Sequence, residues 1–249
     1  MREVQTYYLT DAGKVREHNE DSVIIIKNSN GEYLMAVADG MGGHRAGEIA
    51  SSMTIDFLSN AFLMLDTVGD KASAVNWLRE SVDAINKKIF AYTDEFPDSK
   101  GMGTTLVVAL VTESFLLFGN IGDSSGFVIK DNKLYKVTKD HTLVNLLVST
   151  GELTEEEARM HPKKNVLMRA LGANDPIEID IFDVDMGVSS ILLCSDGLTN
   201  MLNEEQIQKV LETQELTIEE RVMRLIKKSN NRGGTDNISI AYLVRESGE

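Results

Sequence analysis

The sequence has little of several features that mark particular classes of protein. Its 249 residues include one cysteine and three prolines, so an internal disulfide framework and a cysteine-rich zinc site are excluded. No apolar run approaches the ~20 residues that span a bilayer, and the N-terminal residues lack the apolar core of a signal peptide. No stretch has linker composition. These absences predict a cytoplasmic protein of enzyme size, and we expect residues 1–249 to form one domain.

Positive charge is also scarce. Lysine and arginine together number 25 against 39 aspartates and glutamates, which gives a formal net charge of −14. Such a surface argues against nucleic acid and anionic membranes as partners. Much of the excess is typical of a solvated surface; Glu155–Glu157, for example, stands near an expected helix start, where it suits the helix dipole. That explanation does not cover the acids that end apolar strands.

The chain repeats one pattern, in which an apolar run ends in an aspartate and then a glycine. Residues 34–38 lead into Asp39, residues 191–194 lead to Asp196, and residues 115–121 lead more loosely to Asp123, while Asp236 stands just before the run 238–243. Asp-Gly alone also occurs for turn geometry, so the repetition carries the weight. In an antiparallel sheet one strand starts beside the end of its neighbour, which allows all four acids to gather at one rim.

Hydrophobic periodicity predicts the order of the elements. Strands are expected at 4–8, 22–26, 33–38, 104–111, 114–119, 126–129, 134–137, 177–184, 191–194 and 238–243. Helices are expected over 46–65, 72–93 and 217–228, with short helices within 142–168 and a helix opening at 203–206. The order is not a regular alternation of strand and helix. It indicates an α+β fold in which antiparallel sheets are covered by helices.

Spacing excludes several kinds of phosphate chemistry. A cysteine phosphatase needs an arginine six places after Cys194, where Asn200 stands. A phosphoaspartate phosphatase of the haloacid dehalogenase type needs a second acid two places after Asp39, where Met41 stands. A dinucleotide fingerprint would need glycine at Arg45, and no Gly-Lys-Ser/Thr of a P-loop occurs.

Carboxylates without histidine or cysteine suit hard cations such as Mg²⁺ and Mn²⁺ better than zinc. Packed carboxylates repel one another and raise their pKa values unless cations lie among them. Two cations ~3.5–4 Å apart can hold a bridging water, lower its pKa and direct it at phosphorus. The residues therefore favour hydrolysis of phosphate esters by a metal-activated water.

Over essentially the whole chain these residues resemble the protein phosphatase 2C (PPM) family of metal-dependent serine/threonine phosphatases. The matching motifs occur in family order: 13–22, 37–44, 101–105, 119–124, 140–141, 161–165, 169–172, 194–198 and 233–237. One such motif is weak, whereas this many in order are specific. The resemblance is greatest to the compact bacterial members that oppose Hanks-type serine/threonine kinases.

The resemblance implies a four-layer α-β-β-α sandwich, two antiparallel sheets flanked by helices, with two Mn²⁺ or Mg²⁺ ions at one end. Asp39 would bridge both cations and the carbonyl of Gly40 would complete one site. Asp196 and Asp236 would bind the other cation. Asp123 with Asp196 would hold a third, weaker cation.

One departure from the family pattern lies beside the third site. Ser125 stands where the family usually has arginine. This departure bears on the local support of Asp123 and leaves the two-metal core unaffected.

Further roles follow from the same resemblance. Arg16 would grip the substrate phosphate, which a guanidinium fork suits. Glu20 and Asp21 would orient waters at the metal centre, and Asn237 would support the acids from behind. Residues near 145–169 match a flap that family members use to vary substrate choice.

The histidines and the cysteine are less informative. His44, in the glycine loop, has two open interpretations: a general acid for the leaving alkoxide, or an exposed or merely supporting side chain. His18, His141 and His161 are predicted to be structural. Cys194, inside an apolar run, is predicted to be a small buried hydrophobe.

The implied function is hydrolysis of phosphoserine and phosphothreonine in proteins by a cytoplasmic monomer. Its partners would be phosphorylated proteins, among them a serine/threonine kinase and the substrates of that kinase. Two alternatives stay open from the residues. One is a phosphoprotein-binding module that has lost turnover, and the other is a hydrolase of small phosphomonoesters or nucleotide-type messengers.

Overall fold

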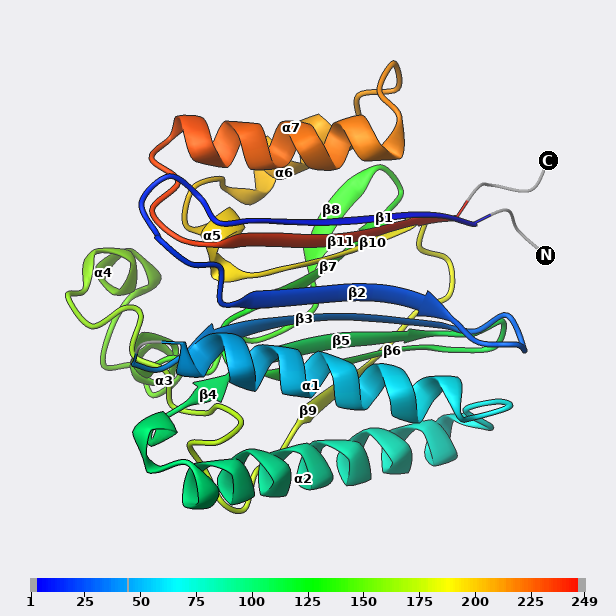
Figure 1. Ribbon diagram of the computed structural model, residues 1–249. Coiled ribbons are helices and arrows are strands. Elements are labelled where there is room, and N and C mark those ends of the chain that lie inside the picture. The colour runs from blue at the N-terminus through cyan, green and yellow to red at the C-terminus, as the bar shows by residue number, and fades with distance from the viewer. Residues whose placement is uncertain (1–3, 44, 246–249) are drawn as a thin grey trace.

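A computed structural model describes residues 4–43 and 45–245 of the chain (Figure 1). The strands are β1 (Val4–Asp11), β2 (Asp21–Lys27), β3 (Tyr33–Met41), β4 (Gly103–Thr104), β5 (Leu106–Val111), β6 (Leu116–Ile121), β7 (Ser125–Lys130), β8 (Lys133–Lys136), β9 (Asp180–Val184), β10 (Ser190–Cys194) and β11 (Ile238–Arg245). The helices are α1 (Ala46–Leu63), α2 (Lys71–Glu95), the short 3₁₀ helix η1 (Pro97–Ser99), α3 (Leu143–Ser149), α4 (Glu155–Met160), α5 (Asp196–Thr199), α6 (Glu204–Leu211) and α7 (Ile218–Asn231).

The strands form two antiparallel sheets that pack face to face. One has the order β1-β11-β10-β7-β8, and the other has the order β2-β3-β5-β6-β9 with β4 beside β3. Helices α6 and α7 cover the outer face of the first sheet, and α1 and α2 cover the outer face of the second (Figure 1). The predicted four-layer α-β-β-α sandwich is confirmed.

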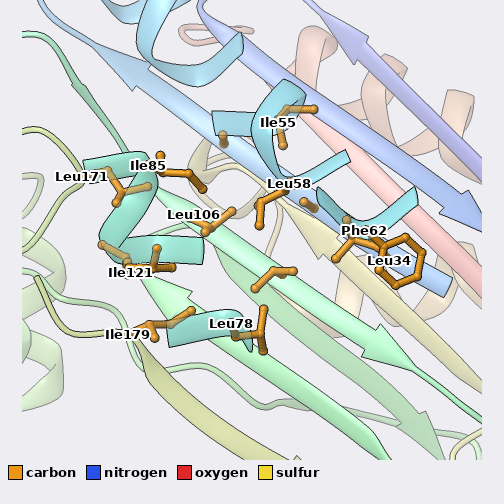
Figure 2. Packing of buried hydrophobic residues seen from close by; sticks show 14 of the residues in the cluster. Leu34, Ile55, Leu58, Phe62, Leu78, Ile85, Leu106, Ile121, Leu171 and Ile179 are labelled. Atoms are coloured by element: carbon orange, nitrogen blue, oxygen red, sulfur yellow. The ribbon is translucent and has the colours of Figure 1, made fainter. Parts of the chain in front are cut away.

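Three buried layers hold the sandwich together. Strand β3 contributes to two of them, because its side chains alternate between the faces of the sheet. Leu34 and Ala36 face the layer beneath α1 and α2, whereas Met35 and Val37 lie in the layer between the sheets. In the helix-covered layer, Leu58 and Phe62 of α1 gather with Leu78 and Ile85 of α2 and Leu106 of β5 (Figure 2). The third layer lies between the first sheet and helices α5 to α7.

Local signals account for several helix starts. The side chain of Asp70 accepts a hydrogen bond from the Ser73 N–H at the start of α2, which satisfies one unpaired donor of the first turn. Reciprocal capping boxes begin α4, α6 and α7, at Thr154, Asn203 and Thr217 respectively. Among the helices of the described residues, none has the length and apolar content needed to cross a membrane.

Two expected strands were drawn too long. The expected strand 104–111 is divided at Thr105, because the Asp39 N–H donates to the Thr105 side-chain hydroxyl at 3.0 Å, while the Thr105 carbonyl accepts from the Thr104 hydroxyl. The expected strand 177–184 begins only at Asp180, since the carbonyl of Glu178 accepts a hydrogen bond from the Arg169 side chain. Helix α5, whose four residues are too few for a periodic pattern, was not expected.

A buried carboxylate ties the β2–β3 hairpin to the loop between α1 and α2. Glu32 is 6% exposed, and its oxygens accept hydrogen bonds from Asn28, Asn30 and Thr67 side chains and from the Val68 N–H at 2.7–3.2 Å. Burial alone would raise the pKa of Glu32, but these four donors together lower it. The folded state therefore favours the ionised form of the Glu32 carboxyl group.

Replacing Glu32 by Gln should lower the free energy of unfolding by about 1–3 kcal/mol, because the NH₂ of the Gln amide would face N–H and O–H donors that now bond to the Glu32 oxygens. A group whose pKa is lower in the folded state stabilises the folded protein at pH values above its unfolded pKa. This contribution to stability is lost as the pH falls through the folded pKa. The difference in free energy of unfolding between the wild type and Glu32→Gln should therefore become smaller below about pH 4. Urea titrations of the metal-free protein across this range measure it; identical midpoints for both proteins at neutral pH would contradict the assignment.

Candidate metal centre

The acids that end or begin strands gather at one end of the sandwich. Asp21 and Asp39 face each other as partners in the β2–β3 ladder. Asp196 opens α5 directly after β10, Asp236 precedes β11, and Asp123 follows β6. Burial raises the pKa of Asp39 well above its usual range, and the charges of the other four acids raise it further. The structure thus brings together all four acids that the sequence pattern singled out, and adds Asp21.

The backbone of Asp39 is fixed by hydroxyl-bearing neighbours. Its N–H donates to Thr105 Oγ1 at 3.0 Å, and its carbonyl oxygen accepts from Thr104 Oγ1 at 2.9 Å. Thr105 Oγ1 also lies 2.7 Å from Ser124 Oγ, next to Asp123. These contacts connect the end of β3 to the Asp123 loop, so the two acids are held by one set of hydrogen bonds.

Gly40 lies where the start of α1 meets the end of β3. A Cβ at this position would lie 2.1 Å from the carbonyl oxygen of Gly47 and 2.6 Å from that of Glu20. The Gly40 N–H donates to the same Glu20 oxygen at 3.1 Å. Only glycine fits between these two backbones.

Asp21 is almost fully buried, at 8% exposure. Its Oδ2 accepts a hydrogen bond from Ser195 Oγ at 2.7 Å, and Ser195 Oγ accepts one from the Ser239 N–H at 2.9 Å. Burial raises the pKa of Asp21 to about 7 despite these donors, with Asp196 and Asp236 adding to the effect. Ser195 therefore fixes Asp21 across the gap between the two sheets.

Asp196 lies close enough to Asp39 for the two carboxyl groups to affect each other's pKa. Burial and the charge of Asp236 raise the pKa of Asp196 to about 6. Its Oδ2 accepts a hydrogen bond from Asn200 Nδ2 at 2.9 Å. Its Oδ1 is buried and has no partner among the described residues.

Asp236 is linked to both the arginine and the asparagine predicted for the site. Arg16 Nη2 donates to Asp236 Oδ2 at 2.8 Å, and the Asn237 N–H donates to Asp236 Oδ1 at 3.0 Å. The Asn237 side chain accepts from the Glu20 N–H at 2.9 Å and donates to the carbonyl of His18. Asn237 therefore attaches the loop that carries Arg16 and Glu20 to the start of β11.

Asp123 lies at the edge of the cluster. Burial raises its pKa to about 7, with Asp196 and Asp140 adding to the effect and Lys136 opposing it. Ser125, the departure from the family pattern, is the first residue of β7 and pairs with Cys194 of β10. Its hydroxyl is buried without a hydrogen-bond partner among the described residues, so it gives Asp123 no counter-charge.

The residues fit divalent cations. Three buried carboxylate oxygens, Glu20 Oε1, Asp21 Oδ1 and Asp196 Oδ1, have no hydrogen-bond partner within residues 4–43 and 45–245. Unpaired, mutually repelling carboxylates are costly to bury unless cations lie among them. No three His, Cys, Asp or Glu side chains of this part of the chain converge tightly enough to hold an ion alone. Backbone carbonyls and waters would complete each shell, as Mg²⁺ and Mn²⁺ accept.

The remaining candidates are placed as follows. His44 lies outside the described residues. His18 is exposed, and His161 Nδ1 accepts a hydrogen bond from the Lys163 N–H within its own turn. Cys194 is fully buried, and burial raises the pKa of its thiol to about 12. The prediction that Cys194 is a buried hydrophobe is confirmed.

Sequence reasoning assigned no role to Thr105 or Ser195. Each supports the backbone or carboxylate of an acid through its hydroxyl, at 3.0 Å and 2.7 Å respectively. A usable signal was present, because each hydroxyl residue directly adjoins an apolar run: Thr105 precedes residues 106–111 and Ser195 follows residues 191–194. It does not say which distant acid the hydroxyl meets.

A sequence profile of the family described as protein phosphatase 2C matches residues 12–228. The chain belongs to this family. It is 40% identical over 240 residues to the serine/threonine phosphatase Stp of Listeria monocytogenes, covering 96% of this chain and 95% of the relative. It is 37% identical over 238 residues to the protein phosphatase PhpP of Streptococcus pneumoniae, covering 94% and 95%.

Solved structures agree with this membership of the protein phosphatase 2C family. The Streptococcus agalactiae serine/threonine phosphatase superposes with a TM-score of 0.93 at 38% identity, covering 98% of this chain and all of that one. Stp1 of Staphylococcus aureus superposes with a TM-score of 0.91 at 36% identity, covering 100% and 96%. The predicted family, fold and enzyme class, a metal-dependent protein serine/threonine phosphatase, are confirmed.

Proposed function

We propose that residues 1–249 form one phosphatase domain that removes phosphate from phosphoserine and phosphothreonine at a centre of two Mn²⁺ or Mg²⁺ ions. Asp39, the Gly40 carbonyl, Asp196 and Asp236 would hold the pair, and Asp123 with Asp196 would hold a third, weaker ion. When bound, such cations lower the pKa of a coordinated water and supply a hydroxide nucleophile at neutral pH. The observation that carries the proposal is the buried, unpaired carboxylate cluster beside Arg16.

The chain's own residues would do the positioning. Arg16 gives one N–H to Asp236 and is 50% exposed, so its other N–H groups are free to bind phosphate oxygens in a fork. Glu20 and Asp21 keep buried oxygens that accept no protein donor among the described residues, which suits them to orient water. We also propose that His44 acts as the general acid that donates a proton to the leaving alkoxide.

In the cell we place the enzyme in the cytoplasm as a monomer that opposes a Hanks-type serine/threonine kinase. Phosphoproteins, including that kinase and its substrates, would be its partners. The names of the bacterial relatives, serine/threonine phosphatase and protein phosphatase, support a phosphoprotein substrate.

The deciding experiment compares three substrates with Mn²⁺ present: a phosphothreonine peptide, a small aryl phosphate and a cyclic dinucleotide. We expect phosphate release from the peptide and the aryl phosphate, and loss of both on adding chelator. Activity unaffected by chelator would refute the metal mechanism. Absence of turnover on every substrate would favour the binding-module alternative, and preference for the dinucleotide would favour a messenger hydrolase.

The segment 145–169 is proposed as a flap that meets the polypeptide around the phosphorylated residue. It joins the site through Asn145 Nδ2, which donates to the carbonyl of Asp140 at 3.1 Å. Four of the eleven exposed large apolar side chains among the described residues lie here: Leu146 (47%), Met160 (85%), Val166 (42%) and Met168 (47%). Lys163 and Lys164, both exposed, stand beside them. This chemistry suits a phosphopeptide that carries apolar and acidic residues near the phosphate.

Replacing Met160 by Ser should raise KM for a phosphopeptide with leucine near its phosphothreonine about fivefold, the value of about 1 kcal/mol of apolar contact. Turnover of a small aryl phosphate, which does not reach the flap, should not change. Met64→Ser is a matched control, because Met64 is 86% exposed at the end of α1. Equal peptide KM values for Met160→Ser and Met64→Ser would rule out this contact.

A further inference from the structure

His141 uses all of its polar groups in hydrogen bonds to three other segments. Its N–H donates to the carbonyl of Gly122 at 2.9 Å, and its carbonyl oxygen accepts from the Met168 N–H at 2.8 Å. On the ring, Nδ1 accepts from the Gly122 N–H at 3.1 Å. Nε2 lies 3.1 Å from Asp180 Oδ2. A histidine that only filled space in the core would not need hydrogen-bond partners for both ring nitrogens and for both backbone groups.

The contacts fix the tautomer. Because Nδ1 accepts from the Gly122 N–H, its lone pair is engaged and the proton of a neutral ring is on Nε2, where it donates to Asp180. Arg169 Nη1 also lies 3.3 Å from Nε2, but with a proton on both nitrogens this contact is not a hydrogen bond. Burial lowers the pKa of His141, with Asp180 opposing, so the ring is neutral at physiological pH. Arg169 Nη1 donates to the other oxygen of the same carboxylate, Asp180 Oδ1, at 2.6 Å. Asp180 thus holds His141 and Arg169 together.

On one side of His141 lies the loop that carries Asp123. Gly122 has a φ of 99°, and a Cβ there would lie 2.6 Å from the Thr105 side chain. Thr105 in turn holds the backbone of Asp39. The Nδ1 contact therefore acts on a loop with no room to move, directly next to an acid of the metal centre.

On the other side lie the two ends of the segment 143–168. The segment leaves immediately after His141 and Thr142, and it returns at Met168 and Arg169, where Thr142 and Leu167 form an antiparallel bridge. Asp180, the first residue of β9, pairs with Asn120 of β6. The Nε2 contact therefore anchors the base of the segment to a fixed strand.

We infer that His141 is a positioning residue of the phosphatase. Nδ1 fixes the Gly122–Asp123 loop, and Nε2 fixes the base of the 143–168 segment through Asp180. The rigid ring therefore holds the loop and the base of the segment in a constant position relative to each other. The structural part needs only the contacts above. The effect on turnover rests on the proposed role of Asp123.

Two substitutions separate the two contacts. Asn places an amide oxygen near the position of Nδ1, so His141→Asn retains an acceptor for Gly122 and loses the contact with Asp180. Gln places its amide near the position of Nε2, so His141→Gln retains a donor for Asp180 and loses the acceptor for Gly122. His141→Ala removes both, and each amide variant serves as the control for the other.

Metal-free protein gives readouts that do not depend on activity. Amide hydrogen exchange at Gly122 should accelerate at least tenfold in His141→Gln and His141→Ala and stay near the wild-type rate in His141→Asn. Limited proteolysis within 143–168 should accelerate in His141→Asn and His141→Ala and stay near the wild-type rate in His141→Gln. With Mn²⁺, His141→Ala should lose ~10–100-fold in kcat on a small aryl phosphate, the usual cost of losing a partner behind a metal ligand.

Wild-type exchange and proteolysis in His141→Ala would overturn the inference. So would identical behaviour of the Asn and Gln variants in both assays, since a role in packing alone does not distinguish the two ring nitrogens. Failure of the proposed function looks different. A wild-type protein without phosphatase activity would refute the proposed function. The exchange and proteolysis patterns would still test the two contacts of His141.

Discussion

Asp39→Asn should abolish turnover and at the same time stabilise the metal-free protein. Asp39 lies deep among protein atoms while remaining partly accessible, and four other carboxylates raise its pKa. Without a cation, its negative charge is repelled and unpaired. An asparagine amide removes the charge and adds an NH₂ donor to a cluster in which buried carboxylate oxygens of Asp21 and Asp196 lack hydrogen-bond partners, so the cost of burying the charge is removed and a new hydrogen bond can form.

The opposite signs make Asp39→Asn a sharp test. We expect kcat to fall by about 10³-fold or more, because a carboxylate proposed to hold the cations is gone. We expect the metal-free variant to gain about 1–3 kcal/mol, which corresponds to roughly 2–4 °C in Tm per kcal/mol for a chain of this size. Mn²⁺ should raise the Tm of the wild type by mass action and that of the variant much less.

Phosphate release and thermal unfolding with and without Mn²⁺ measure both effects. Asp56→Asn is the control, since Asp56 is exposed on α1 and its loss should change neither. A variant that is inactive and also less stable without metal would indicate a folding defect. A fully active variant would exclude Asp39 from the centre.

The sequence was most informative where local chemistry and strand geometry coincide. The apolar run before Asp39 and the glycine after it predicted that the strand ends at this acid; β3 in fact continues through Asp39 and Gly40 to Met41. Antiparallel pairing nevertheless accounted for the acids gathering at one rim. The same geometry sets Asp21 opposite Asp39 in the ladder. Both inferences need only the two-residue period of a strand and the direction of its neighbour.

Contacts between distant segments could not be predicted from single-residue patterns. Nothing local to Ser195 indicates that its hydroxyl meets Asp21, 174 residues away. Gly40 looked like a turn glycine, whereas its essential property is the close approach of Gly47. His141 was expected to be structural, and the pattern gave no sign that its two nitrogens contact different segments. These features depend on how the sheets and helices dock, which a window of sequence does not contain.

Arg16→Ala should weaken transition-state binding by about 10–100-fold in kcat/KM, the value of one or two hydrogen bonds to a charged group. Arg16 is half-exposed and its Nη2 bonds to Asp236 at 2.8 Å, which holds the guanidinium at the edge of the acid cluster. A dianionic phosphate brought to this edge meets repulsion from the carboxylates, and Arg16, which is paired with Asp236, offers it a positive charge there. Its loss should therefore raise KM for every phosphomonoester, small or large.

Arg16→Lys separates charge from geometry. Lysine keeps the positive charge but cannot bond to Asp236 and to two phosphate oxygens in one plane, so it should recover only part of the loss. The Tm of either variant should change little, because an exposed ion pair contributes about 0–1 kcal/mol. Arg79→Ala, on the exposed face of α2, is the control. Inorganic phosphate gives an independent measure, since its inhibition constant should rise in parallel with KM if Arg16 binds the phosphate. A lysine variant with wild-type KM and wild-type phosphate inhibition would show that only charge matters here and would refute the bidentate role.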